Sequence, residues 1–246
     1  MTRQSLNCVA LVTGGSRGIG AAIVRRLASD GASVAFTYSS SEKQALELVS
    51  EVENSRGIAS AIKADSAVPE AVRGAVARTV ARFGRLDVLV NNAGILLRGT
   101  VDDFDLADFD RMVAINIKAV FVATQAAIPH LREGARIITT GSVAAERAGF
   151  PGASVYSMTK GAVAALTRGL ARDLGPRGIT VNAVQPGPTE TDMNASPEVH
   201  GMLKPLIALG RIGKDHEVAS LVAYLAGPES SFVTGAFLNA DGGYLA

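Results

Sequence analysis

The sequence predicts an α/β fold of three layers, in which a doubly wound parallel sheet of seven strands lies between two layers of helices. Short apolar or β-branched runs alternate along the chain with longer segments whose apolar residues recur at helical spacing. Alternation of this kind favours parallel strands joined by right-handed crossovers. The strand runs are apolar throughout, rather than at every second residue, which indicates that helices cover both faces of the sheet.

Each predicted element follows from its own run of residues. The predicted strands are residues 8–13, 33–37, 60–64, 87–92, 136–142, 180–185 and 236–240. Helical spacing is clearest for Ile23 and Leu27, for Ala45, Leu48, Val49 and Val52, and for Val72, Val76, Val80 and Phe83. No linker rich in proline, glycine or serine and no repeat divides the chain, so we expect residues 1–246 to form a single domain.

The segment of residues 186–216 is a long stretch without a clear strand pattern, and it contains Pro186, Pro188, Pro197 and Pro205. Because loops beyond the carboxyl ends of parallel strands bind ligands, we expect this segment to form a substrate lid. Its large apolar residues indicate either an apolar pocket for a ligand with hydrocarbon substituents, or packing within the lid or a subunit interface. They are Met193, Met202, Leu203, Leu206 and Ile207.

Composition and charge narrow the functional classes. The 246 residues carry a formal net charge of +1 and no basic tract, so we expect no nucleic acid and no membrane surface as a partner. Cys8 is the only cysteine and stands in the apolar run CVALV, which indicates a small core residue and excludes a disulfide within the chain. The first residues, MTRQSLN, lack an apolar signal core, and no apolar run reaches the roughly 18 residues of a membrane span. These features favour a cytoplasmic protein.

The stretch VALVTGGSRGIGAAIVRRL, residues 9–27, begins as a buried strand, breaks into glycines and resumes as a helix. A diphosphate placed between a strand ending near Thr13 and a helix beginning near Gly18 would meet unpaired N–H groups and the positive end of the helix dipole. The TGxxxGxG spacing differs from GxGxxG and lacks the GKS or GKT ending of a nucleoside-triphosphate loop. The glycines therefore either admit a dinucleotide, as in a Rossmann fold, or serve only the turn; they are Gly14, Gly15, Gly18 and Gly20.

The end of the second predicted strand bears on which dinucleotide is bound. An acidic residue there would hold the ribose 2′-hydroxyl of NAD, whereas a basic neighbourhood accepts the 2′-phosphate of NADP. The sequence reads YSSS at residues 38–41, and Arg17 in the glycine turn can supply a charge-assisted contact. We therefore expect NADP(H), although a strand that ended later would bring Glu42 into the position that selects NAD.

Ser142, Tyr156 and Lys160 form the candidate catalytic group. Ser142 closes the fifth predicted strand, at the sheet edge where ligands bind. Tyr156 and Lys160 are four residues apart, so on a helix the phenol and the ammonium share one face. A free phenol, with a pKa of about 10, exchanges protons poorly near neutral pH, and an adjacent cation would lower that pKa. Taken alone, Tyr156 also fits a half-buried helix aromatic and Lys160 a solvated helix charge.

These features together resemble the short-chain dehydrogenase/reductase family, from residue 6 to residue 244. The matching motifs are TGGSRGIG (13–20), NNAG (91–94), Asn116 in INIKAVF, Ser142, YSMTK (156–160), PGPTETDM (186–193) and the terminal NADGG. Within the family the chain is most similar in appearance to the 3-oxoacyl-acyl-carrier-protein reductases and related carbonyl reductases. The resemblance implies an NADP-dependent oxidoreductase that reduces a ketone or 3-oxoacyl thioester to a secondary alcohol.

The resemblance also implies roles for individual residues. Tyr156 would be the general acid, and Ser142 would hydrogen-bond the substrate carbonyl. Lys160 would bind the nicotinamide ribose and lower the pKa of the phenol, while Asn116 would hold a water in the proton relay. The residues expected to hold NADP(H) are Gly14, Ser16, Arg17, Gly18, Ile19, Gly20, Tyr38, Ser39, Ser40, Asp65, Ser66, Asn92, Ala93, Gly94, Tyr156, Lys160, Pro186, Gly187 and Thr189.

Partners and assembly are further expectations. Arg132 and Arg172 fall near the positions where acyl-carrier-protein reductases place docking arginines, although each also fits a solvated helix charge. In the family, the helices that contain Asn116 and Tyr156 form the main dimer interface, and a contact through the C-terminal strand completes a homotetramer. Small residues on these helices allow close packing: Ala119, Ala123, Ala126, Ala162, Ala165 and Gly169.

Two rival functions stay open at this point. One is an NAD(P)-dependent dehydrogenase that oxidises a sugar or a secondary alcohol. The other is a nonenzymatic dinucleotide-binding regulator, which would have lost part of the catalytic set. No metal is expected, because His130, His200 and His216 are isolated in the sequence.

Overall fold

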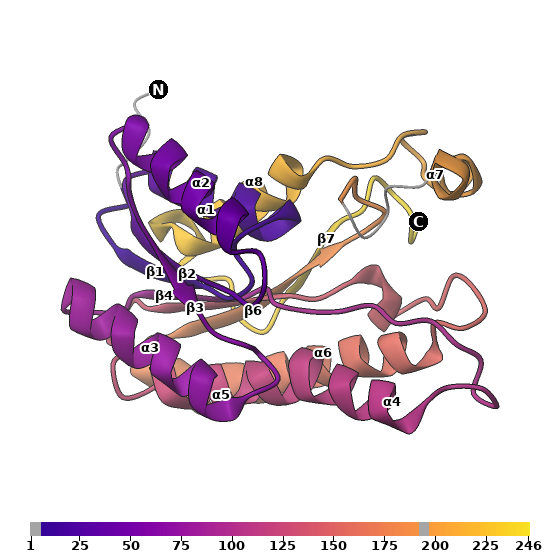
Figure 1. Ribbon diagram of the computed structural model, residues 1–246, viewed down its shortest axis with the longest axis horizontal. Coiled ribbons are helices and arrows are strands. Elements are labelled where there is room, and N and C mark those ends of the chain that lie inside the picture. Colours follow the sequence, from indigo (N-terminus) through magenta and orange to yellow (C-terminus); the bar gives the residue numbers. More distant parts are fainter. Residues whose placement is uncertain (1–5, 192–196) are drawn as a thin grey trace.

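The computed structural model describes residues 6–191 and 197–246, and its strands form one sheet (Figure 1). The strands are β1 (Val9–Val12), β2 (Ser33–Tyr38), β3 (Ile58–Lys63), β4 (Val88–Asn91), β5 (Arg136–Thr140), β6 (Thr180–Pro186) and β7 (Phe237–Ala240). The α-helices are α1 (Gly18–Ser29), α2 (Glu42–Asn54), α3 (Pro69–Phe83), α4 (Leu106–Val113), α5 (Ala119–Ala127), α6 (Ser154–Leu174), α7 (Pro197–Leu203) and α8 (Asp215–Ala226). Every predicted strand run overlaps an observed strand.

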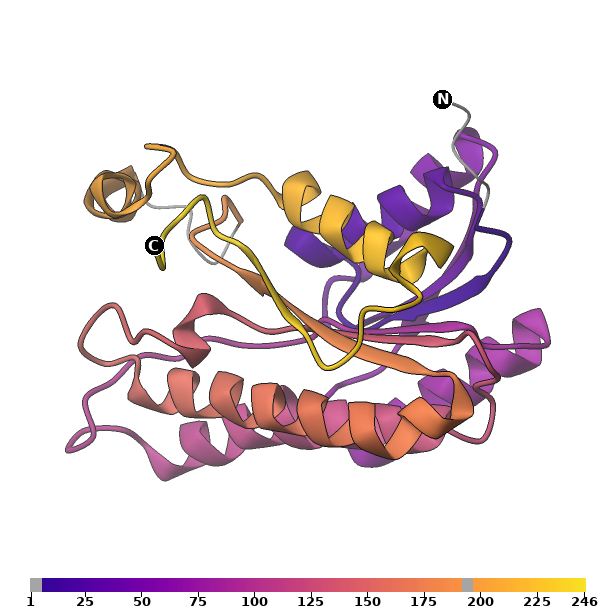
Figure 2. The same ribbon diagram turned by 180° about the vertical axis from the view of Figure 1, so that it is seen from behind.

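The sheet has the strand order β3-β2-β1-β4-β5-β6-β7, and all neighbouring strands are parallel. Helices α1, α2 and α8 cover one face, and α3, α5 and α6 cover the other, as Figures 1 and 2 show from opposite sides. The predicted three-layer, doubly wound Rossmann fold is thereby confirmed. The chain order reverses between β1 and β4, and in such sheets ligands bind beyond the carboxyl ends of the strands at this point.

Two apolar clusters fill the space between the sheet and its helices. Ala10 and Val12 of β1 belong to the cluster under α1, α2 and α8, whereas Leu11 belongs to the cluster under α3, α5 and α6. All three residues have 0% exposure. Because successive side chains of a strand point to opposite faces, a strand covered on both sides buries its residues on both and is predominantly apolar. This explains the unbroken apolar runs in the sequence.

The helix ends follow local sequence signals. Helix α3 has Pro69 in its first turn, and Gly84, with a left-handed φ of 77°, follows its last residue. At the start of α4, the Asp105 side chain accepts a hydrogen bond from the Ala107 N–H at 2.6 Å. A π-helical turn, Ala114–Lys118, joins α4 to α5. Turns of this type occur often at functional sites.

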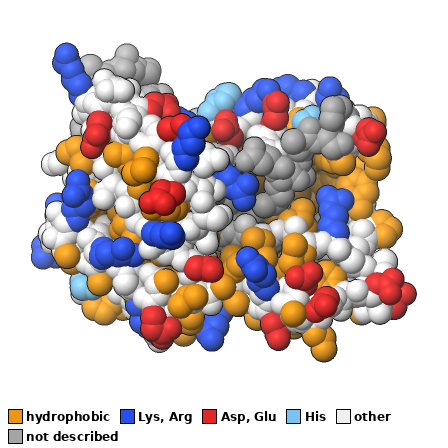
Figure 3. Space-filling model, viewed as in Figure 1, with side chains coloured by type: hydrophobic (Ala, Val, Ile, Leu, Met, Phe, Trp, Pro, Cys, Tyr) orange, Lys and Arg blue, Asp and Glu red, His pale blue; other side chains and the backbone are white. Residues whose placement is uncertain are grey.

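The surface bears on three of the expectations from sequence. On the face seen in Figure 3, acidic and basic side chains are interspersed, and hydrophobic side chains come to the surface over the part that holds α7. Among the described residues, no helix is both long enough and apolar enough to span a membrane.

Cys8 is half-buried at the edge of the cluster under α1, where burial raises the pKa of its thiol from 9.0 to about 11.

The small residues proposed to face a second subunit are divided between the core and the surface. Ala119 and Ala123 of α5 are buried in the cluster under α3, α5 and α6. They support packing within the chain instead of contact with another copy. Ala165 and Gly169 of α6 are exposed, and that part of α6 remains open to a partner.

Leu27→Ala tests the packing of α1 against the sheet. Leu27 has 0% exposure, so we expect its truncation to lower the free energy of unfolding by about 2–5 kcal/mol. The matched control is Leu46→Ala on α2, because Leu46 is 55% exposed; we expect a change of about 0.5 kcal/mol or less. Urea unfolding at one protein concentration measures both. Equal losses in the two variants would contradict the described core.

Candidate active site

A cleft of about 690 Å³ opens beyond the carboxyl ends of β1 and β4. It collects residues from the segments after all seven strands, which are far apart in the sequence. The predicted residues that line it are Gly14, Ser16, Arg17, Gly18, Ile19, Gly20, Tyr38, Ser39, Ser40, Asp65, Ser66, Asn92, Ala93, Gly94, Ser142, Tyr156, Lys160, Pro186, Gly187 and Thr189. Asn116 is the one predicted site residue that does not line the cleft.

The glycine turn between β1 and α1 is shaped by close backbone contacts. Gly14 has a left-handed φ of 63°, and its N–H donates to Thr37 Oγ1 at 2.9 Å. A Cβ atom on Gly20 would lie 2.1 Å from the Gly14 carbonyl oxygen, so no larger residue fits there. Arg17 precedes α1 and does not cap it with its side chain. Gly18, Ile19 and Gly20, the first residues of α1, line the cleft, and the N–H groups at a helix N-terminus suit an anionic diphosphate.

Asn92 fastens the end of β4 to this turn. Its Nδ2 donates to the carbonyl groups of Thr13 and Gly14, at 3.1 and 3.0 Å. Thr13 Oγ1 in return accepts the N–H groups of Asn92 and Ala93, each at 3.0 Å. Without the family resemblance, NNAG would have been interpreted as a simple turn. In the structure, this segment binds the end of β4 to the turn after β1, and these are the two strands between which the chain order reverses.

The end of β2 carries no acidic residue into the cleft. Strand β2 ends at Tyr38, one residue later than predicted, and Ser39 and Ser40 line the cleft after it. Glu42 is the first residue of α2 and is not part of the lining. Its carboxylate accepts a hydrogen bond from the Tyr38 hydroxyl at 3.3 Å. Glu42 therefore does not occupy the position that selects NAD.

Ser142 and Tyr156 meet at the centre of the cleft. Ser142 Oγ accepts the Ala144 N–H at 3.1 Å, and its hydroxyl is hydrogen-bonded with the Tyr156 side chain. Burial raises the pKa of the Tyr156 phenol, and the hydrogen bond with Ser142 opposes this by lowering it. The net direction is upward, so the phenol is neutral and holds its proton near pH 7.

Lys160 lies one turn further along α6 and is almost fully buried. Its Nζ donates to the Thr140 carbonyl at 3.0 Å and lies 5.6 Å from the centroid of the Tyr156 ring. Burial lowers the pKa of the ammonium to about 8. The ammonium lies over the ring and is bonded to a main-chain oxygen. The net rise in the pKa of Tyr156 comes from burial of the phenol. That the Lys160 cation lowers this pKa stays a prediction.

Asn116 holds the loop after β4 from outside the cleft. Its Oδ1 accepts the Ile95 N–H at 2.9 Å, and its Nδ2 donates to the Ile95 carbonyl at 2.9 Å and to Thr159 Oγ1 at 3.1 Å. Both amide hydrogens are therefore engaged within the chain. The π-helical turn places this side chain between the loop and α6. Its role in binding a water stays a prediction.

Gln185, which the sequence analysis did not single out, fastens the loop after Ser142. It is 1% exposed, and its Nε2 donates to Glu146 at 2.7 Å and to Asn239 at 3.2 Å. The bonds link the serine loop to β6 and β7. The available signal was a long polar side chain at the end of a strand run whose every residue is buried.

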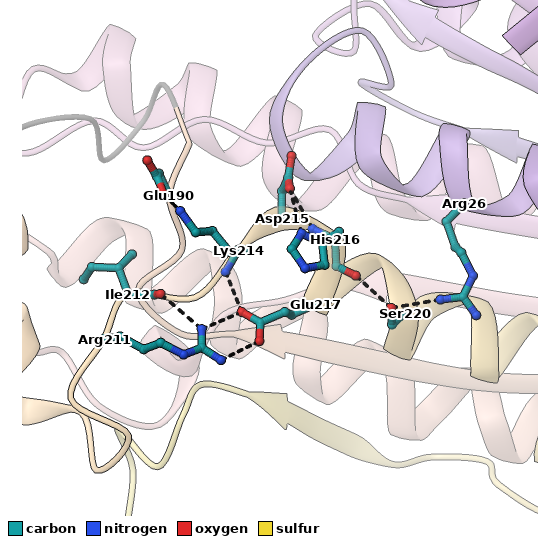
Figure 4. Close-up of polar contacts among 9 residues, drawn as sticks. All are labelled: Arg26, Glu190, Arg211, Ile212, Lys214, Asp215, His216, Glu217 and Ser220. Atoms are coloured by element: carbon teal, nitrogen blue, oxygen red, sulfur yellow. Dashed lines mark hydrogen bonds and ion pairs between the residues drawn. The ribbon is translucent and has the colours of Figure 1, made fainter. Parts of the chain in front are cut away.

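The predicted lid is fastened at its base by charged side chains (Figure 4). The Arg211 guanidinium donates to both carboxylate oxygens of Glu217, at 2.8 and 2.6 Å, and Lys214 forms an ion pair with Glu190. Hydrogen bonding from Arg211 lowers the pKa of Glu217 to about 2. No local sequence pattern indicates this network, because its charges resemble any set of surface charges.

The apolar lid residues divide between the interior and the surface. Leu203 and Ile207 are buried, and Leu203 lines the cleft. Met202 and Leu206 are exposed. Met193, together with the end of the PGPTETDM motif, lies outside the described residues. The lid therefore contributes an apolar wall through one side of α7.

The substrate end of the cleft contains residues that the sequence analysis did not assign. The apolar and aromatic ones are Leu97, Phe150 and Tyr244, and the basic ones are Arg98, Arg111 and Arg147. They come from the loops after β4 and β5, from α4 and from the last residues of the chain. Among the described residues, no group of three His, Cys, Asp or Glu side chains is placed to hold a metal ion.

Comparisons with known proteins agree with this geometry. A family model described as enoyl-(acyl carrier protein) reductase matches residues 14–245. The cyclic-di-GMP-binding biofilm dispersal mediator protein of Escherichia coli K12 is 47% identical over 235 residues, which is 95% of each chain. A short-chain dehydrogenase/reductase structure from Serratia marcescens BCRC 10948 has a TM-score of 0.96 and 53% identity, covering 99% of this chain and 100% of its own. A short chain dehydrogenase from Burkholderia cenocepacia J2315 in complex with NADP has a TM-score of 0.96 and 50% identity, covering 100% of both chains.

Lys160→Met removes the buried charge, and we expect its effect on stability to depend on pH. In the folded chain the pKa of Lys160 is about 8, below the ordinary 10.5, so between these values the unfolded chain binds more protons. The charge therefore lowers wild-type stability below pH 8, and this cost disappears as the pH rises toward 10.5. We expect the stability of the variant relative to the wild type to fall by about 2–4 kcal/mol across this range.

Urea unfolding of the cofactor-free chain at a series of pH values measures this difference. Lys43→Met is the matched control, because the Lys43 side chain is 86% exposed and its substitution should give no such trend. A difference between Lys160→Met and wild type that stays constant from about pH 7 to about pH 10 would show that the lysine is not desolvated.

Proposed function

Because the chain belongs to the short-chain dehydrogenase/reductase family, we propose that it reduces a ketone to a secondary alcohol with NADPH, with Tyr156 as general acid. One observation carries the proposal. The hydroxyl groups of Ser142 and Tyr156 converge beside the Lys160 ammonium, in the same cleft that contains the glycine turn. Two donors aimed at one point suit an oxygen that gains negative charge.

The residues of the cleft fit NADP(H). The glycine turn packs too closely for a side chain at Gly20, and Gly18, Ile19 and Gly20 at the N-terminus of α1 line the cleft, where a diphosphate would bind. Arg17 lines the cleft, and the end of β2 presents Ser39 and Ser40 instead of a carboxylate. These features support a cofactor with a 2′-phosphate. When bound, the reduced cofactor supplies the hydride to the carbonyl carbon.

The side chains of the chain orient the ketone and deliver the proton. Ser142 and Tyr156 donate hydrogen bonds to the carbonyl oxygen, which holds the carbonyl in place and stabilises its developing charge. The Tyr156 hydroxyl then gives its proton to that oxygen, leaving a phenolate. With a pKa of about 8, Lys160 is largely protonated at neutral pH, so its charge stabilises the phenolate. The raised pKa of Tyr156 keeps the proton in place until the oxygen becomes more basic.

The apolar wall of the lid favours an apolar ketone or a 3-oxoacyl thioester as substrate. Arg132 and Arg172 are both exposed, which is compatible with docking of an acyl carrier protein. We further propose that residues 1–246 act as one catalytic domain, in the cytoplasm, and assemble as a homotetramer. Phe121 of α5 and Met158 of α6 support the assembly, because these large apolar side chains are 48% and 43% exposed.

Two alternatives predict other results. An NAD(P)-dependent dehydrogenase would oxidise a sugar or a secondary alcohol faster than it reduces ketones, which initial rates on ethyl acetoacetate, cyclic ketones and glucose with both cofactors would reveal. A nonenzymatic regulator, by analogy with the name of the Escherichia coli relative, would bind cyclic-di-GMP without turnover. Competition between cyclic-di-GMP and NADPH for the protein measures whether cyclic-di-GMP binds in the cofactor cleft. Reduction of an enoyl thioester in preference to a 3-oxoacyl thioester would contradict the proposed reaction.

Tyr156→Phe should remove the proton donor while leaving the cofactor groove intact. We expect kcat for ketone reduction to fall by about 10²–10⁴-fold, the usual contribution of a general acid. The Kd for NADPH, measured by nicotinamide fluorescence, should change little, because the glycine turn lies at the other end of the cleft. Turnover close to that of the wild type would refute Tyr156 as the acid.

Ser39→Asp should reverse the cofactor preference. A carboxylate directly after β2 repels the 2′-phosphate of NADPH and can accept the ribose hydroxyl of NADH. We expect the ratio of kcat/KM for NADPH to that for NADH to fall by about 100-fold, equivalent to roughly 2.7 kcal/mol. Ser39→Asn, which adds similar volume without charge, is the control and should retain the NADPH preference. An unchanged ratio in Ser39→Asp would place the 2′-phosphate elsewhere.

A further inference from the structure

The last residues of the chain turn back from β7 toward the lid, and Figures 1 and 2 show the C terminus on the side of α7. The Asp241 carboxylate accepts the Gly243 N–H at 2.9 Å, and Gly242 and Gly243 have left-handed φ values of 64° and 82°. A Cβ on Gly242 would lie 2.8 Å from Ile207, and one on Gly243 would lie 2.7 Å from Ala208. The tail is therefore seated closely against the lid.

Tyr244 follows this turn and enters the cleft. Its side chain is 4% exposed and packs in a small apolar cluster with Val143 and with lid residues that include Leu203 and Ile207. It also lines the cleft that contains Ser142 and Tyr156. Because Val143 directly follows Ser142, the Tyr244 ring stands between the lid and the loop that carries the catalytic serine.

Two contacts hold the ring in this position. The Arg147 guanidinium carbon lies 5.0 Å from the centroid of the Tyr244 ring, and its Nη1 donates to the Tyr244 carbonyl at 3.1 Å. On another side, a Cβ added to Gly149 would lie 2.3 Å from the Tyr244 hydroxyl oxygen but 3.6 Å from the ring carbon that bears it. Arg147 and Gly149 belong to the loop after β5, so this loop and the tail fix each other.

From this placement, we infer that Tyr244 determines substrate specificity. Its ring forms the part of the cleft wall that limits the size of one substituent of the substrate carbonyl, namely the substituent that points away from the glycine turn. The inference rests on the proposed function, in which the substrate of the protein is a ketone. The ring acts through its bulk, since its position is set by packing and by Arg147. It takes no part in proton transfer, which belongs to Tyr156.

The surroundings of Tyr244 differ from those of an ordinary core residue. A side chain that only stabilised the lid would be enclosed by the apolar cluster, whereas Tyr244 also forms part of the cleft surface. A bulky substituent beside Ser142 must therefore meet this ring or displace it. The family resemblance ends at residue 244 and assigns this tyrosine no role.

Tyr244→Ala tests the inference through a pair of ketones of different size, ethyl acetoacetate and ethyl benzoylacetate. We expect the ratio of kcat/KM for the larger ketone to that for the smaller to rise by about tenfold or more, mainly through KM. Tyr244→Phe, which retains the ring, should keep the wild-type ratio within about twofold. Leu206→Ala is the lid control, because Leu206 is exposed and lies outside the cleft lining. Thermal unfolding shows that each variant is folded.

Gly149→Ala provides a second test that leaves Tyr244 in the chain. The new Cβ collides with the Tyr244 hydroxyl, so the ring must move and the size preference must change. Removal of that hydroxyl relieves the collision, and the double variant Gly149→Ala with Tyr244→Phe should return to the wild-type preference. Failure of the double variant to restore it would contradict the described contact.

Binding of unreactive carbonyl compounds separates this inference from the proposed function. The affinities of acetamide and benzamide for the NADPH complex, followed by nicotinamide fluorescence, require no turnover. If Tyr244→Ala favours benzamide by about tenfold over wild type while no ketone is reduced, the wall is supported and the proposed reaction fails. If ketones are reduced and Tyr244→Ala leaves both size ratios unchanged, the inference is overturned and the reaction stands.

Discussion

The buried ammonium of Lys160 is the constraint on which the rest of the active site depends. A charge without water must find its hydrogen-bond partners within the protein. Lys160 bonds the Thr140 carbonyl, so α6 must pass close to the end of β5. The same approach brings Tyr156, one turn earlier on α6, against Ser142. The relative positions of the phenol, the serine and the ammonium thus follow from the packing of one helix against one edge of the sheet.

Amide side chains and ion pairs hold different parts of this site. Asn92, Asn116 and Gln185 each bond a neighbouring loop or strand from a half-buried or buried position. Such bonds are costly to break where water cannot replace them. The lid base depends instead on exposed pairs such as that of Arg211 with Glu217, and exposed pairs contribute little in water. The described base of the lid is therefore fastened by weaker interactions than the groove beside the sheet.

The sequence predicted those features that depend on local pattern. The strands were found because a sheet covered on both faces needs unbroken apolar runs, and Tyr156 with Lys160 because four residues make one helical turn. Spacing shows that two groups share a face, but not how much water surrounds them, so it did not reveal that burial raises the pKa of Tyr156. The bonds of Asn116 and the position of Tyr244 depend on contacts between distant segments, which no local pattern records.

The half-buried thiol of Cys8 has a practical consequence. With a pKa of about 11, roughly one thiol in ten thousand is ionised at pH 7, and the thiolate is the form that reacts with maleimides and iodoacetamides. The Cys8 thiol of the native chain therefore reacts very slowly with these reagents. A single cysteine introduced at an exposed lid position, such as Met202, would carry a fluorophore or spin label selectively, without prior removal of the natural one.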